Sequence, residues 1–169
     1  MTAKPETAKV TVERASEREL LVTRSFDASA ALVFEAWSRP ELFRQWWTPK
    51  SMGMTIVSCE MDVRTGGSYR LEIGHPAFDS PMAFFGRYLD VVPGERIVWT
   101  NEENGEGAIT TVTFAEADGR TTVVISNLFP NVQGLEEELA SGACDSMDET
   151  LAQLEALLGS GPVTCAFEV

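Results

Sequence analysis

Histidine and basic residues are scarce in this chain of 169 residues, which has one His and 13 Lys plus Arg against 26 Asp plus Glu. The formal net charge of −13 opposes the phosphate contacts and counterion release on which nucleic-acid binding depends. No basic residue follows Arg120, so the C-terminal part is expected to present an acidic surface. We therefore expect neither nucleic acid nor an anionic membrane surface as a partner.

The single histidine, His75, and three cysteines limit the chemistry that the chain can support. One histidine excludes a His-rich metal site, and neither a Gly-x-Ser-x-Gly motif nor a papain-type cysteine context occurs. Glycine-rich phosphate-binding motifs are also missing. Cys59 alternates with Val57 and Met61, which predicts a buried, inert thiol. We expect no metal, no cofactor and no catalytic residue that the sequence can identify.

Long hydrophobic runs are absent as well. A membrane-spanning helix needs about 18 or more consecutive apolar residues, and the N-terminal residues lack the apolar run of a signal peptide. An odd number of cysteines leaves one unpaired in any disulfide scheme, which favours a reducing compartment. These observations predict a cytoplasmic protein without membrane insertion.

The N-terminal region combines a tail with a strand. Residues 1–15 are polar and follow no sustained period, which predicts a flexible tail. Residues 17–26 alternate in polarity and predict a strand with Leu20, Val22 and Arg24 on one face.

Two short helices are expected after this strand. Asp27 or Ser29 offers an N-cap oxygen to a helix over residues 30–38. Pro40 fits the first turn of a second helix over residues 40–47.

The middle of the chain reads as an antiparallel meander. Six segments of strand length follow one another, at residues 54–62, 68–74, 82–92, 95–102, 108–116 and 121–129. Turn residues separate most of them: Gly66-Gly67, Pro93-Gly94, Asn104-Gly105 and Asp118-Gly119. In the second segment Tyr69, Leu71 and Ile73 share a face, which we expect to point inward.

The chain closes with a long amphipathic helix, for which the apolar positions lie three or four residues apart: Leu135, Leu139, Ala143, Met147, Leu151, Leu154 and Leu158. Gly142 predicts a kink. Residues 160–169 are expected to form a tail or a short edge strand, which leaves a single domain over residues 16–159.

This order of elements predicts an α+β helix-grip fold, in which a curved antiparallel β-sheet wraps around a long C-terminal α-helix, with two short helices after the first strand. Several short sequence motifs occur in a characteristic order along the chain: Val33-Phe34-Glu35-Ala36-Trp37, Pro40-Glu41-Leu42, Trp46-Trp47, Gly66-Gly67-Ser68-Tyr69, Gly86-Arg87-Tyr88-Leu89, Pro93-Gly94-Glu95-Arg96-Ile97-Val98-Trp99-Thr100, Thr121-Thr122-Val123-Val124 and Leu151-Ala152-Gln153-Leu154. Over residues 17–158 the chain thereby resembles the START-like (Bet v 1-like, SRPBCC) superfamily. Within that superfamily it resembles the group named after the activator of heat-shock protein 90 ATPase homologue.

The resemblance implies a hydrophobic cavity between the sheet and the long helix, in which members of the superfamily bind lipids, hormones or polyketides. We therefore predict reversible, non-catalytic binding of a small hydrophobic or amphipathic molecule. Two alternatives stay open, because a fold alone does not choose a function. One is a polyketide cyclase or aromatase-type enzyme, and the other is a co-chaperone-like protein-interaction module with a chaperone partner.

The residues expected to line the cavity combine bulk, strand or helix phase and family-like position. They are Trp46, Tyr69, Phe84, Tyr88, Trp99 and Met147. We expect a cavity of roughly 300 Å³ or more, since smaller spaces seldom hold a ligand. The group's commoner Gly-Trp near the start of the last helix is replaced here by Ser146-Met147, so a ligand contact of that Trp is not carried over.

Overall fold

The computed structural model describes residues 11–77, 79–102, 107–141 and 143–160. Within these ranges an eight-stranded sheet has the order β1-β2-β8-β7-β6-β5-β4-β3, and each neighbouring pair is antiparallel. Its strands are β1 Thr11–Arg14, β2 Glu19–Phe26, β3 Thr55–Met61, β4 Ser68–Gly74, β5 Met82–Val92, β6 Arg96–Thr100, β7 Ile109–Ala117 and β8 Arg120–Leu128. The helices are α1 Ala30–Ser38, α2 Pro40–Phe43, the 3₁₀ helix η2 Lys50–Met52, α3 Val132–Ser141 and α4 Ala143–Ser160.

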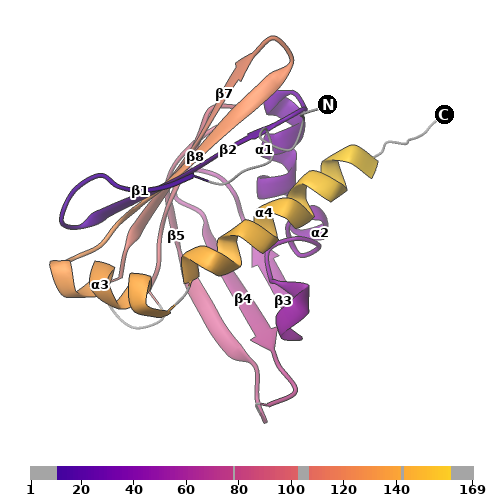
Figure 1. Ribbon diagram of the computed structural model, residues 1–169. Coiled ribbons are helices and arrows are strands. Elements are labelled where there is room, and N and C mark those ends of the chain that lie inside the picture. Colours follow the sequence, from indigo (N-terminus) through magenta and orange to yellow (C-terminus); the bar gives the residue numbers. More distant parts are fainter. Residues whose placement is uncertain (1–10, 78, 103–106, 142, 161–169) are drawn as a thin grey trace, which may run out of the picture.

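Helix α4 lies across the concave side of the curved sheet, as Figure 1 shows. Leu151 and Leu154 are fully buried in the main hydrophobic core, and Met147 and Leu158 pack against that core. Asp148, on the opposite face of α4, is exposed. The part of the stripe from Met147 to Leu158 therefore faces the sheet as predicted, and the α+β helix-grip fold is confirmed. The stripe was wrong at Leu139 on α3, which is 41% exposed.

The flexible tail predicted over residues 1–15 was wrong for residues 11–14, which form β1. This strand pairs with β2, from Thr11 opposite Thr23 to Arg14 opposite Leu20. All four β1 side chains are exposed, so backbone hydrogen bonds to β2 hold the strand and no apolar face marks it in the sequence. The two short helices consequently follow the second strand. Residues 1–10 lie outside the described ranges.

The strand and helix starts at the N-terminal side follow local rules. Side chains of β2 alternate in burial: Leu20, Val22 and Arg24 share one face as predicted, and that face is buried. Ser29 caps α1, since its hydroxyl accepts a hydrogen bond of 3.3 Å from the Leu32 N–H. Helix α2 ends at Phe43, earlier than the predicted residue 47.

Strand β3 contains a bulge that the sequence does not reveal. Its pairing with β4 shifts register between Ile56 and Ser58. Ile56 is buried, whereas Val57 is 55% exposed, so the predicted shared face of Val57, Cys59 and Met61 was wrong. Because side chains alternate along a strand, one extra residue moves every later side chain to the other face.

Strand β5 passes very close to β6 at Gly86. A Cβ atom at this position would lie 2.0 Å from the Thr100 carbonyl oxygen, so only glycine fits. The β7–β8 hairpin, at the other end of β7, turns through Asp118 and Gly119, whose φ angles are 55° and 79°. Two successive positive φ angles are typical of the tight turns that join twisted antiparallel strands.

The C-terminal helical region comprises α3, described up to Ser141, and α4, described from Ala143. The kink predicted at Gly142 lies outside the described ranges. The predicted turn at residues 104–105 and the predicted tail or edge strand after residue 160 lie outside the described ranges. No helix in the described part of the chain is both long and apolar enough to span a membrane.

Candidate functional site

A cavity of about 330 Å³ lies between the concave face of the sheet and helix α4. Its walls come from α1, α2 and the segment after it, from β3 to β6, and from α4. The side chains that line it are Trp37, Phe43, Trp47, Thr48, Pro49, Met54, Met61, Tyr69, Leu71, Ile73, Phe84, Tyr88, Trp99, Asn101, Met147 and Thr150. Most are apolar or aromatic, and none of these described residues carries a charge.

Five of the six residues predicted to line a cavity are brought together here: Tyr69, Phe84, Tyr88, Trp99 and Met147. Strand phase explains the first four, because alternate side chains of a strand point to the same face. The stripe of α4 explains Met147. Their role in binding a ligand remains a prediction.

The sixth residue, Trp46, was wrongly placed. Its side chain is fully buried, and its indole N–H donates a hydrogen bond of 3.0 Å to the Ala36 carbonyl oxygen, which ties the turn after α2 to α1. The neighbouring Trp47 lines the cavity instead, stacked on Phe43 with 4.8 Å between ring centroids. Helix α2 ends before this pair, so helical periodicity could not decide which indole faces the cavity.

The aromatic rings of the lining form a continuous series. The ring centroids of Tyr69 and Tyr88 are 5.6 Å apart, and Tyr69 lies 6.5 Å from Trp99. Trp99 in turn meets Trp47 edge to face at 6.4 Å. Rings at these separations offer faces and edges that suit a flat, apolar molecule.

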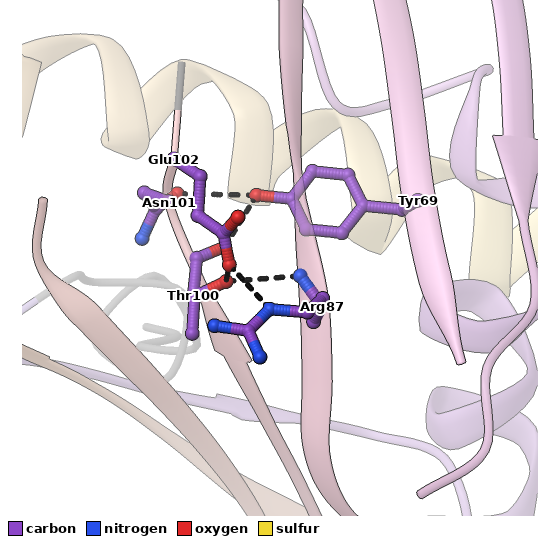
Figure 2. A network of polar contacts seen from close by, with 5 residues as sticks. All are labelled: Tyr69, Arg87, Thr100, Asn101 and Glu102. Atoms are coloured by element: carbon purple, nitrogen blue, oxygen red, sulfur yellow. Dashed lines mark hydrogen bonds and ion pairs between the residues drawn. The ribbon is translucent and has the colours of Figure 1, made fainter. Parts of the chain in front are cut away.

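Tyr69 uses its hydroxyl within the protein (Figure 2). The hydroxyl donates to the Thr100 carbonyl oxygen at 2.7 Å and lies 3.4 Å from the Asn101 Oδ1. The Asn101 amide donates to the Ala108 carbonyl oxygen and the Thr110 hydroxyl, at 2.8 and 3.0 Å. This network fixes the side chains of Tyr69 and Asn101 at one end of the cavity.

The same end of β6 carries an ion pair on its outer side (Figure 2). The Arg87 guanidinium donates to the Glu102 carboxylate at 2.7 Å, and the Thr100 hydroxyl donates to the same carboxylate oxygen. Both hydrogen bonds lower the pKa of Glu102 from its usual value, and the bond from Thr100 has the larger effect. The charges thus lie outside the set of residues that line the cavity.

Tyr88 differs from Tyr69 in its hydrogen bonding. Its side chain is 5% exposed, and within the described residues its hydroxyl makes no hydrogen bond. Burial raises the pKa of Tyr88 well above its usual value, and the nearby Cys59 and Asp62 add to the shift. The phenol therefore stays protonated at physiological pH.

Helix α4 is clamped to the segment that follows α2. The Gln153 amide donates to the carbonyl oxygens of Trp46 and Thr48, at 2.9 and 2.8 Å, and its oxygen accepts from the Lys50 N–H at 2.9 Å. The Glu149 carboxylate accepts from the Ser51 N–H and hydroxyl, at 2.9 and 2.6 Å. We define these contacts as the α4 clamp. Sequence reasoning missed it, because polar residues on an exposed helix face carry no signal of their partners.

Cys59 and His75, two reactive side chains of the described ranges, do not line the cavity. Cys59 is a free, half-buried thiol whose pKa is raised by burial. His75 accepts a hydrogen bond of 2.9 Å from the Ala77 N–H through its Nδ1 atom. Across the described residues, no group of three or more His, Cys, Asp and Glu side chains is placed to hold a metal ion.

A helix-grip domain with an apolar, aromatic cavity under its last helix defines the class of this protein. The family model described as "Activator of Hsp90 ATPase homolog 1-like protein" matches residues 27–159, and the chain belongs to this family. The resemblance to this group that was inferred from short sequence motifs is thereby confirmed. No curated protein matches the chain.

Solved structures share the fold. A protein from Rhodobacter sphaeroides is 19% identical with a TM-score of 0.83, over 90% of this chain and 99% of that one. A protein from Chromobacterium violaceum is 30% identical with a TM-score of 0.69, over 82% and 95% of the two chains. An AHSA1-like protein from Aeromonas hydrophila is 17% identical with a TM-score of 0.65, over 80% and 92%.

Proposed function

We propose that the cavity binds a small hydrophobic or amphipathic molecule reversibly and without catalysis. The observation that carries this proposal is the lining itself, which is aromatic and apolar and includes no charged side chain among the described residues. A volume of about 330 Å³ falls at the lower end of the roughly 300–1,000 Å³ found for ligand pockets. Burying apolar ligand surface there provides the driving force for binding.

The geometry favours binding over the cyclase or aromatase alternative. A cyclase of this kind needs a group in the cavity that moves a proton. The Tyr69 hydroxyl is committed to Thr100, and the raised pKa of Tyr88 keeps its phenol protonated, so it is a poor base. The co-chaperone-like alternative uses the surface of the domain, and recovery of a chaperone in a pull-down without any small molecule would support it instead.

A cytoplasmic location belongs to the same proposal. It is supported by the odd number of cysteines, because proteins of oxidising compartments usually pair theirs.

The test is a titration of N-phenyl-1-naphthylamine, an uncharged fluorescent probe, against the wild-type protein and two variants. Met147→Trp fills the cavity, whereas Leu139→Trp adds the same side chain at an exposed position on α3. We expect saturable binding to the wild type and to Leu139→Trp, and at least a tenfold loss in Met147→Trp with the circular dichroism unchanged. Equal binding by Met147→Trp, or none by the wild type, would refute the proposal.

A further inference from the structure

We propose that the ligand of this cavity is an uncharged ring compound with one oxygen that forms a hydrogen bond with the Tyr88 hydroxyl. This inference rests on the proposed function and names the chemical class that the site selects. It follows from which hydroxyl and amide groups of the lining are already paired within the protein and which hydroxyl is not.

Five side chains with a hydroxyl or amide group line the cavity: Thr48, Tyr69, Tyr88, Asn101 and Thr150. The indoles of Trp37, Trp47 and Trp99 add N–H donors to the lining, but no further hydroxyl. Four of the five hydroxyl and amide side chains have partners within the protein. The Thr150 hydroxyl donates to the Met147 carbonyl oxygen at 3.1 Å. The Thr48 hydroxyl lies 3.5 Å from the Met54 carbonyl oxygen. Tyr69 and Asn101 belong to the network at the end of β6. Tyr88 is the member of the described lining whose hydroxyl makes no hydrogen bond.

The Tyr88 hydroxyl is also open to the cavity. Three described side-chain atoms are both sealed from solvent and unpaired, namely Nε and Nη1 of Arg24 and Nε1 of Trp37. The Tyr88 oxygen is not among them, so it borders accessible space, and the space that its side chain lines is the cavity. A ligand atom can therefore reach this hydroxyl, whereas it cannot reach the Trp37 nitrogen without a rearrangement.

An unpaired hydroxyl in an apolar site favours a ligand that supplies the missing partner. Burial keeps the Tyr88 phenol protonated, so it can donate to a carbonyl oxygen or accept from a ligand hydroxyl. A carboxylate ligand is disfavoured, because no lining residue of the described chain offers a positive charge to offset its desolvation. The site therefore selects neutral oxygen-containing rings over their charged analogues.

The experiment compares three probes of similar shape: naphthalene, 2-acetonaphthone, which adds a carbonyl, and 2-naphthoate, which adds a charge. Each probe is titrated as a competitor of bound N-phenyl-1-naphthylamine against the wild type, Tyr88→Phe and Tyr69→Phe. Tyr88→Phe removes only the free hydroxyl, so its fold should persist. Tyr69→Phe is the matched control, since its hydroxyl is spent on Thr100.

We expect Tyr88→Phe to weaken 2-acetonaphthone binding about 3- to 10-fold, the range for one hydrogen bond, and to leave naphthalene binding unchanged. Tyr69→Phe should change the affinities for both probes by the same factor, and 2-naphthoate should bind the wild type more weakly than 2-acetonaphthone does. The carbonyl stretching frequency of bound 2-acetonaphthone should rise in Tyr88→Phe, which a purely structural role of Tyr88 would not produce.

The two proposals fail in different ways. If naphthalene and 2-acetonaphthone bind the wild type, and Tyr88→Phe alters both equally or neither, the role of Tyr88 is refuted while the cavity remains a binding site. If no probe displaces the dye and the dye itself does not bind, the proposed function is refuted together with the inference.

Discussion

The Arg24 guanidinium on β2 and the Glu155 carboxylate on α4 form an ion pair of 2.6 Å that joins the inner face of the sheet to the last helix. The two partners differ in exposure, at 2% for the Arg24 side chain and 48% for that of Glu155. The guanidinium carbon also lies 5.2 Å from the centre of the Phe26 ring. Two Arg24 nitrogens have no partner among the described residues, so the buried charge depends on Glu155.

Glu155→Gln should therefore destabilise the fold by about 1–3 kcal/mol, the usual cost of leaving a buried donor poorly satisfied. Chemical denaturation with urea measures this change. Arg24→Met offers the comparison, because it replaces the charge with an apolar chain of similar length and removes the need for a partner. We expect the double variant to be more stable than Glu155→Gln alone. If Glu155→Gln proved neutral, the ion pair would contribute nothing to stability.

Leu154→Ala should lower the free energy of unfolding by about 2–5 kcal/mol, since Leu154 is fully buried between α4 and the sheet. The loss combines apolar transfer with the cavity left behind. Leu139→Ala, at an exposed position on α3, is the control and should change stability by less than about 1 kcal/mol. Equal effects of the two substitutions would show that the α4 stripe is not the core contact described above.

The two adjacent tryptophans should separate stability from binding. Trp46→Phe removes a buried indole whose N–H pairs with Ala36, so it should cost at least about 1 kcal/mol of stability. Trp47→Phe, at the half-buried position that lines the cavity, should cost less and instead weaken binding of N-phenyl-1-naphthylamine. Thermal unfolding and dye titration of both variants test this. The opposite pattern would place Trp46 at the binding site after all.

Acid should loosen the α4 clamp. Hydrogen bonds from the Ser51 hydroxyl and N–H hold the pKa of Glu149 below its ordinary value of 4.5. Because the folded-state pKa is the lower one, the contribution of Glu149 is complete above the unfolded-state value and is lost as pH falls through the folded-state value. Between pH 6 and 3, the Tm of Glu149→Gln should therefore fall by less than that of the wild type. Asp148→Asn, on the exposed face of α4, is the control, and its Tm should fall as much as that of the wild type. Parallel curves for all three proteins would contradict this role.

Much of the architecture is predictable because local patterns and global packing agree. Strand bounds at residues 68–74 and 82–92 coincide with β4 and β5, and the helix at residues 30–38 coincides with α1. Turn glycines, a capping serine and a period of two or 3.6 residues carry this information along the chain. β1 escaped prediction because its exposed side chains leave only backbone pairing to define it.

The candidate site is predictable wherever an element has a clear phase. Tyr69, Phe84 and Tyr88 were placed at the cavity by strand alternation, and Met147 by its helical stripe. Phase failed at Val57, where a bulge intervenes, and at Trp46, where α2 has already ended. In both cases the missing information is a backbone irregularity, which leaves no mark in the order of polar and apolar residues.

The sequence by itself determined the fold class, the order of the elements and the apolar faces that meet, because hydrophobic periodicity and turn residues act over a few neighbouring positions. Only the tertiary structure decided which polar groups are paired. The Tyr69 hydroxyl meets Thr100, 31 residues away, and Arg24 meets Glu155 across 131 residues, whereas Tyr88 is left without such a partner in the described chain. Hydrogen bonds depend on distances and angles between atoms of different elements, and these exist only once the sheet has curved around α4.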